Sequence, residues 1–106
     1  MIQYKQSLIS SEKLYHLIGK NIRHLRQRKN MTQEELAELI DGDQKYISKI
    51  ESGKAKPRLT VYLKIANAFH VSIAQFLVDA IKPSLELDEK NILHQIFPNQ
   101  AEKELI

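Results

Sequence analysis

The sequence contains no cysteine and only three glycines and three prolines among its 106 residues. Without cysteine the chain can form no disulfide, thiolate zinc site or cysteine nucleophile, and it suits a reducing compartment. So few glycines and prolines leave little material for the many turns of an all-β fold. No apolar run approaches the roughly 18–20 residues of a membrane span, and the first residues, MIQYKQSLISSEK, lack the basic-then-apolar order of a signal peptide. We therefore expect a cytoplasmic, all-α protein with no membrane association.

The length and composition are those of one ordinary folded domain. Apolar residues make up 42% of the chain and charged residues 27%, close to the averages for globular proteins. The charge is unevenly distributed: residues 1–80 carry 13 Lys and Arg against 8 Asp and Glu, whereas residues 81–106 carry 3 against 5. The basic excess predicts a polyanionic partner for the first three quarters of the chain, and a different role for its end.

The first two predicted helices have clear local signals. Apolar residues at positions 14, 18, 22 and 25 follow the helical period and predict a helix over residues 11–29. A second, short helix begins after Thr32, which forms a capping box with Glu35, while Met31 and Leu36 form a hydrophobic staple around it. The short helix then ends at the Asp-Gly-Asp sequence that follows it.

A third helix over residues 43–52 places Ile47 and Ile50 on its inner side, and Gly53 is a suitable stop. The second and third helices are short and about three residues apart, which is the pattern of a helix-turn-helix unit. In that unit one helix braces the other, which enters the major groove of DNA. A fourth helix is predicted over residues 59–69.

The remaining helical signals lie toward the C-terminus. Ser72 and Gln75 form the pattern of a second capping box and open a fifth helix, which we expect to run to Lys82 because Pro83 interrupts it. Asp88 is then placed to cap an additional C-terminal helix. We therefore divide the chain into a DNA-binding domain at 11–82 and a helical extension at 83–106.

The motifs IRHLR, TQEELA, ISKIESGK and VSIAQFL occur in order within residues 22–77. Together they resemble the lambda-repressor-like helix-turn-helix family, also called XRE, which includes phage repressors and Cro proteins. The resemblance implies a compact five-helix DNA-binding bundle, with the helix after Gln33 as the brace and residues 43–51 as the recognition helix. It further implies that Arg26 and Glu51 form a partly buried structural ion pair.

Two positions depart from the family pattern. Asp41 stands where the family usually has glycine, and Gly42 where it has an apolar residue. Asp tolerates a left-handed backbone, so we expect the turn to form with the loss of one small core contact. Arg58 stands where the family favours serine as the cap of the fourth helix, so that cap is lost and a cation is added beside the DNA backbone.

The third helix carries polar side chains on the side away from Ile47 and Ile50. The candidates for base reading are Gln44, Lys45, Ser48 and Lys49. A glutamine amide suits adenine, and lysine suits guanine O6 and N7. The candidates for phosphate binding are Thr32, Gln33, Tyr46, Lys54, Lys56 and Arg58. The alternative for both sets is an ordinary solvated face.

The apolar residues near the C-terminus exceed what a five-helix bundle needs. We expect them to form a homodimer contact, because helix-turn-helix proteins commonly bind as twofold dimers. The candidates are Ile81, Leu85, Ile92, Leu93, Ile96 and Phe97. The alternative is that they fold back onto their own bundle.

The sequence therefore predicts a dimeric transcriptional regulator, a repressor that binds an inverted repeat in double-stranded DNA. The alternative is an antitoxin or bridging module whose main partner is another protein, held by the C-terminal helix. His16 lies four residues from Glu12, but no further ligand completes a metal site. No phosphate loop or nucleophile motif is present. We expect no catalysis, no cofactor and no metal.

Overall fold

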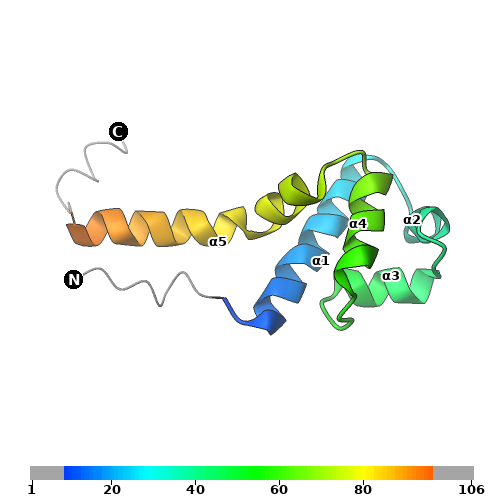
Figure 1. The fold of residues 1–106 in the computed structure, drawn as a ribbon, viewed down its shortest axis with the longest axis horizontal. Helices are drawn as coiled ribbons and strands as arrows, with labels where there is room; N and C mark the ends of the chain where they lie inside the picture. The colour runs from blue at the N-terminus through cyan, green and yellow to red at the C-terminus, as the bar shows by residue number, and fades with distance from the viewer. Residues whose placement is uncertain (1–8, 97–106) are drawn as a thin grey trace. The chain divides into compact units, whose positions relative to one another are not determined.

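The computed structural model describes the backbone of residues 9–96 and the side chains of residues 9–84. These residues form an all-helical structure of five helices without strands (Figure 1). The helices are α1 (Ser11–Arg28), α2 (Gln33–Leu39), α3 (Gln44–Glu51), α4 (Leu59–Ala68) and α5 (Ile73–Ile96). The all-α prediction is confirmed, and the first four helices lie within two residues of their predicted bounds.

The helix starts follow from capping side chains. Ser10, Thr32 and Asp43 each accept a hydrogen bond from the backbone N–H three residues later. Thr32 forms the complete capping box with Glu35, whose side chain accepts from the Thr32 N–H at 3.1 Å. Arg58 precedes α4 without a side-chain cap, as its departure from the family pattern predicted.

The first four helices end in one common way. In each, the chain leaves the helix through a residue with positive φ, and the N–H of the next residue bonds back to a carbonyl of the last turn. For α2, the N–H of Gly42 donates to the carbonyl of Ala37 at 2.9 Å. The N–H of the positive-φ residue itself also bonds back to the last turn. This pair of hydrogen bonds is the Schellman motif. The positive-φ residues are Asn30 (53°), Asp41 (56°), Gly53 (77°) and His70 (58°).

The core lies between the apolar faces of all five helices. Its largest fully buried side chains are those of Phe69, Phe76, Ile22, Leu36, Ile47, Ile50 and Ile65. α3 packs against both α1 and α2, and α2 also packs against α4 (Figure 1). α1 comes so close to α3 that a Cβ on Gly19 would lie 2.3 Å from the carbonyl oxygen of Ile50. α3 is thus held on two sides by the rest of the bundle.

The predicted break at Pro83 is wrong. α5 continues through Pro83 to Ile96, so the expected helix starting after Asp88 is the second half of α5. Proline has a helical φ and removes only one hydrogen bond, although it strains the preceding turn. The residues that follow, Leu-Glu-Leu-Asp-Glu-Lys, are mostly strong helix formers, and they carry the helix on. Only half of the expected capping box forms: Ser72 Oγ accepts from the N–H of Gln75, whereas the side chain of Gln75 donates to Asp79.

Residues 10–81 form one compact unit, and the part of α5 from Lys82 onward belongs to a second. Across residues 9–96, no single helix has both the length and the apolar composition to cross a membrane. The bent pair of α4 with residues 73–84, turning by 99°, meets both criteria, but its side chains at Ile65 and Phe76 are buried in the core.

Candidate nucleic-acid interface

The turn between α2 and α3 is short and tightly bonded. Asp41 adopts the left-handed conformation, and Gly42 does not. An ideal Cβ on Gly42 would contact Ile40 at 3.5 Å and Tyr46 at 3.7 Å. The structure therefore has room for a Cβ at this position, beside Ile40 and Tyr46. The side chain of Asp43 then accepts from the N–H of Tyr46 at 2.8 Å and begins α3.

The packing of α3 determines which of its side chains face outward. Ile47 and Ile50 are fully buried and Glu51 at the end of the helix is buried as well, so the opposite side of α3 is left to solvent. The four candidate base-reading residues, Gln44, Lys45, Ser48 and Lys49, are all exposed. Tyr46, a phosphate candidate, is half-buried and packs against the core. A shallow hollow beside it is lined by Gly42, Asp43, Lys45, Tyr46 and Lys49.

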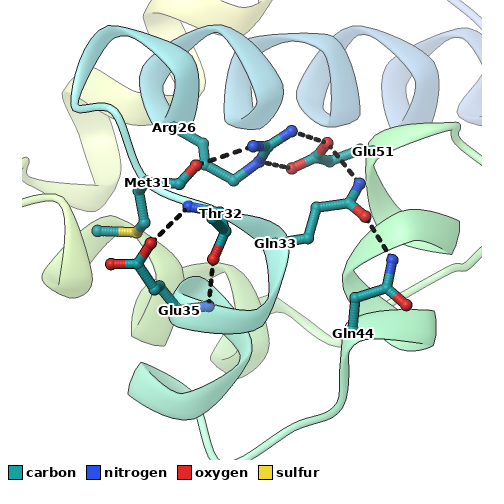
Figure 2. A network of polar contacts seen from close by, with 7 residues as sticks. All are labelled: Arg26, Met31, Thr32, Gln33, Glu35, Gln44 and Glu51. Carbon is teal, nitrogen blue, oxygen red and sulfur yellow. Dashed lines mark hydrogen bonds and ion pairs between the residues drawn. The ribbon is translucent and has the colours of Figure 1, made fainter.

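Arg26 and Glu51, the two residues that the family resemblance pairs, form a bidentate ion pair between α1 and α3 (Figure 2). Arg26 Nε donates to Glu51 Oε2 at 2.7 Å and its Nη2 donates to Oε1 at 3.0 Å. Arg26 Nη1 donates to the carbonyl of Met31 at 2.9 Å. The side chains are 13% and 4% exposed, respectively. The hydrogen bond to Glu51 raises the pKa of Arg26, so the guanidinium stays charged.

Gln33 and Gln44 extend this ion pair toward the surface (Figure 2). Gln33 Nε2 donates to Glu51 Oε1 at 3.1 Å, and Gln44 Nε2 donates to Gln33 Oε1 at 2.6 Å. Gln33 is the first residue of α2 and Gln44 the first residue of α3. Both residues are candidates by sequence, but their contact could not be predicted, because nothing in the local pattern indicates that two helix starts meet.

The phosphate candidates lie in two places. Thr32 and Gln33 border a hollow at the start of α2 that Arg26, Gln44 and Glu34 also line. The capping box occupies the N–H groups of Thr32 and Glu35. Among the described residues, the N–H groups of Gln33 and Glu34 have no protein acceptor. These two groups can therefore donate to an anion, although the Glu34 carboxylate beside them opposes it.

The second group of phosphate candidates, Lys54, Lys56 and Arg58, is exposed on the loop between α3 and α4. Half-buried Ala55 and buried Pro57 alternate with them. This alternation anchors the loop on its inner side and leaves the three cations in solvent.

The dimerisation candidates fall mostly outside the described side chains. Ile81 is half-buried. Leu85, Ile92, Leu93 and Ile96 belong to the backbone of α5, but their side chains lie outside the described residues, as does all of Phe97. Within the described part of the chain, no three His, Asp or Glu residues are grouped so as to hold a metal ion.

Comparison with known proteins gives concordant matches. A model of the helix-turn-helix family matches residues 22–76. An uncharacterised HTH-type transcriptional regulator of Sinorhizobium fredii is 36% identical over 56 residues, which are 53% of this chain and 73% of that protein.

Two solved structures have similar folds. One is the clp gene regulator ClgR from C. glutamicum, with a TM-score of 0.61 and 28% identity, covering 63% of this chain and 86% of that one. The other is the restriction-modification controller protein C.AhdI from Aeromonas hydrophila, with a TM-score of 0.56 and 31% identity, covering 58% of this chain and 94% of that one. By their names the first is a gene regulator and the second a controller protein, and both are similar to this chain in fold.

Proposed function

Because this chain belongs to the lambda-repressor-like (XRE) helix-turn-helix family of transcriptional regulators, we propose that it is a sequence-specific repressor that binds an inverted-repeat operator as a dimer. In this proposal α3 enters the major groove and α2 braces it against the DNA backbone. A regulator of this kind acts on DNA, which supports the cytoplasmic location that we expect from the sequence.

The exposed face of α3 is the observation that carries the proposal. Two isoleucines of this eight-residue helix are buried, and four polar side chains that can bond base edges are exposed opposite them. Gln44 lies in the first turn, where recognition helices meet bases. Gln44, Lys45, Ser48 and Lys49 therefore read the bases in this proposal.

The phosphate contacts position the protein on the duplex without specifying a sequence. Thr32 and Gln33 bind one phosphate beside the start of α2, and Lys54, Lys56 and Arg58 bind others from their loop. Tyr46 stands at the edge of α3, close enough to the turn to add a further contact. If about four to six phosphates are bound per subunit, affinity falls steeply as salt rises.

The C-terminal extension, residues 83–106, supplies the dimer contact in this proposal. Since α5 runs unbroken, Ile81, Leu85, Ile92 and Ile96 recur at intervals of four, seven and four along one helix. This apolar repeat is typical of a helix that packs against another helix. Leu93 and Phe97 repeat the same four-residue interval one position later.

The test is selection of bound sequences from random duplex DNA, followed by measurement of Kd for the selected site. We expect an inverted repeat whose half-sites are about ten base pairs apart. Gln44→Ala should weaken binding by about 1–3 kcal/mol at one base pair, whereas Lys56→Ala should weaken binding to all sequences and lower the salt slope by about one.

Three outcomes would contradict the proposal or one part of it. Enrichment of no sequence, with affinity that disappears in salt, would reduce the basic face to a nonspecific electrostatic surface. An equal loss on every sequence for Gln44→Ala would remove Gln44 from base reading. Sedimentation of the chain with its selected DNA site measures how many chains bind one duplex. One chain per duplex would exclude the dimer.

A further inference from the structure

The outward side of α1 carries an uninterrupted stripe of basic and polar side chains. Its members recur at intervals of three and four residues, the spacing that keeps side chains on one face of a helix, and all of them are exposed. We call this set the α1 basic stripe: Lys13, His16, Lys20, Arg23 and Gln27. At 1.5 Å per residue the stripe is about 21 Å long, and it contains no acidic residue.

The contacts of α1 show that the stripe faces away from the bundle. Gly19 lies against the backbone of α3, where there is no room for a Cβ, and Arg26 bonds Glu51 at the end of the same helix. On another side of α1, Asn21 Nδ2 donates to the carbonyl of Phe76 on α5 at 3.2 Å. The core covers the side between these two contacts, which leaves the side of the stripe open to solvent.

The protein does not neutralise the charges of the stripe. Within the part of the chain whose side chains are described, Lys13, Lys20 and Arg23 form no ion pair. Glu12 is the one acidic residue in the sequence of α1. Like charges three or four residues apart on a helix repel each other, as Lys20 and Arg23 do. A polyanion laid along α1 would relieve this repulsion.

The stripe adjoins the loop that carries the second group of phosphate candidates. Gly53 lies against His16, since a Cβ on Gly53 would be 2.9 Å from His16 Nδ1, and Lys54 follows directly. The α2 side of α3 is different, because three exposed carboxylates there repel phosphate: Glu34, Glu35 and Glu38. DNA that leaves the half-site past the loop therefore meets more cations, and DNA that leaves past α2 does not.

We propose that the α1 basic stripe binds the phosphate backbone of the DNA that flanks the half-site, an inference that rests on α3 being the base-reading helix. Each subunit then covers more duplex than α3 reads. A length of 21 Å corresponds to about six base pairs of duplex. Contacts of this kind add affinity and salt dependence without adding sequence preference.

The experiment measures Kd of the full chain on its selected DNA site, with one flank of about 2, 8 or 14 base pairs and the other kept at the shortest length. The flank sequence is random, so that any gain comes from phosphates rather than from bases. We expect the wild-type chain to bind the longest duplex about tenfold more tightly than the shortest. Its salt slope should be steeper by about two, as for two added phosphates.

Charge-neutral substitutions test whether the stripe causes this gain. Lys20→Gln should lower the gain and reduce the salt slope on the longest duplex by about one. Lys64→Gln, at an exposed position of α4, removes the same charge and should change neither. Lys20→Gln combined with Arg23→Gln should abolish the gain, while Kd on the shortest duplex and the preferred sequence stay as in the wild-type chain.

The possible failures are distinguishable. A selected site whose affinity does not depend on flank length would overturn the stripe and leave the proposed function intact. A gain that persists in the double variant would also overturn it, because other residues would then hold the flank. If a separate duplex joins the complex on the shortest site, and the double variant prevents this, the stripe binds a second DNA molecule instead of the flank. A chain that selects no sequence would overturn both proposals.

Discussion

The substitution Arg26→Met removes the cation from the ion pair and leaves the Glu51 carboxylate in the interior. Arg26 donates three side-chain hydrogen bonds, two to Glu51 and one to the carbonyl of Met31. With Arg26 gone, Glu51 keeps only the bond from Gln33, and its side chain is 4% exposed. Water can therefore replace little of what is lost.

The expected cost follows from this burial. Removing one partner of a buried ion pair costs about 3–5 kcal/mol, and we expect about 3 kcal/mol because Arg26 itself is 13% exposed. A unit of this size has a free energy of unfolding of about 4–11 kcal/mol. The variant should therefore still fold, with a Tm lower by about 12–24 °C.

Denaturant unfolding of a double-mutant cycle provides the measurement. Arg23→Met, an exposed position on the same helix, is the matched control and should change stability by less than about 0.5 kcal/mol. Arg26→Met combined with Glu51→Leu removes both charges and should recover about 2 kcal/mol relative to Arg26→Met. A double variant as unstable as the sum of the two single variants would refute the reasoning, because the two residues would then be energetically independent.

Two further predictions concern the turn and the core. Gly42→Ala should stabilise the chain by about 0.4–1 kcal/mol, since its Cβ meets only ordinary contacts. Gly53→Ala should destabilise the chain, because φ is +77° and His16 lies 2.9 Å from the new Cβ. Thermal unfolding distinguishes the two variants, and equal shifts in Tm would contradict the expectation. Burial raises the pKa of Tyr62 above its ordinary value of 10.0. The unfolded chain therefore loses this proton first, and above pH 10 Tyr62 should lower stability by at most about 1.4 kcal/mol per pH unit, until the folded chain loses the proton too. The decrease of the free energy of unfolding with pH should be smaller in Tyr62→Phe. An unchanged slope in that variant would show that other groups cause the decrease.

The starts of the helices could be predicted from the sequence because their signals are local. A capping box needs only a serine or threonine and an acceptor three residues later, and Thr32 with Glu35 forms one in full. The ends of the helices were harder to predict from the sequence. Gly53 indicates its own turn, but Asn30 and His70 adopt the same left-handed conformation without a glycine. The packing of the whole bundle compensates the small local cost at these two positions, and no short sequence pattern records that.

The C-terminal half of α5 shows that a proline does not always end a helix. Proline inside a helix is unfavourable by about 3 kcal/mol, which was the basis for predicting a break at Pro83. The helix nevertheless continues, because the helix preference of the several residues after Pro83 outweighs the free-energy cost of the one proline. A continuous α5 gives the apolar positions from Ile81 onward one helical register, on which the proposed dimer contact depends.

The exposed face of α3 could also be predicted, since the spacing of Ile47 and Ile50 fixes which side is buried. The hydrogen bonds that join Gln33 to Glu51 and Gln44 could not be. Gln33 is 18 and 11 residues from these two partners, and the contacts depend on the angle at which α2, α3 and α1 meet. That angle is a property of the packed core rather than of any one segment.

Glu51 joins the stability of the bundle to the presentation of α3. One of its oxygens, Oε1, accepts from Arg26 at 3.0 Å and from Gln33 at 3.1 Å. A change that shifts the ion pair therefore also shifts the acceptor on which Gln33 and, through it, Gln44 depend. Arg26→Met should accordingly lower the base preference proposed for Gln44 even in protein that remains folded, whereas Gly53→Ala, which destabilises the bundle away from these hydrogen bonds, should leave that preference unchanged. Selection of bound DNA with both variants at a temperature where each is folded measures the difference, and equal loss of preference in the two would show that stability alone controls base reading.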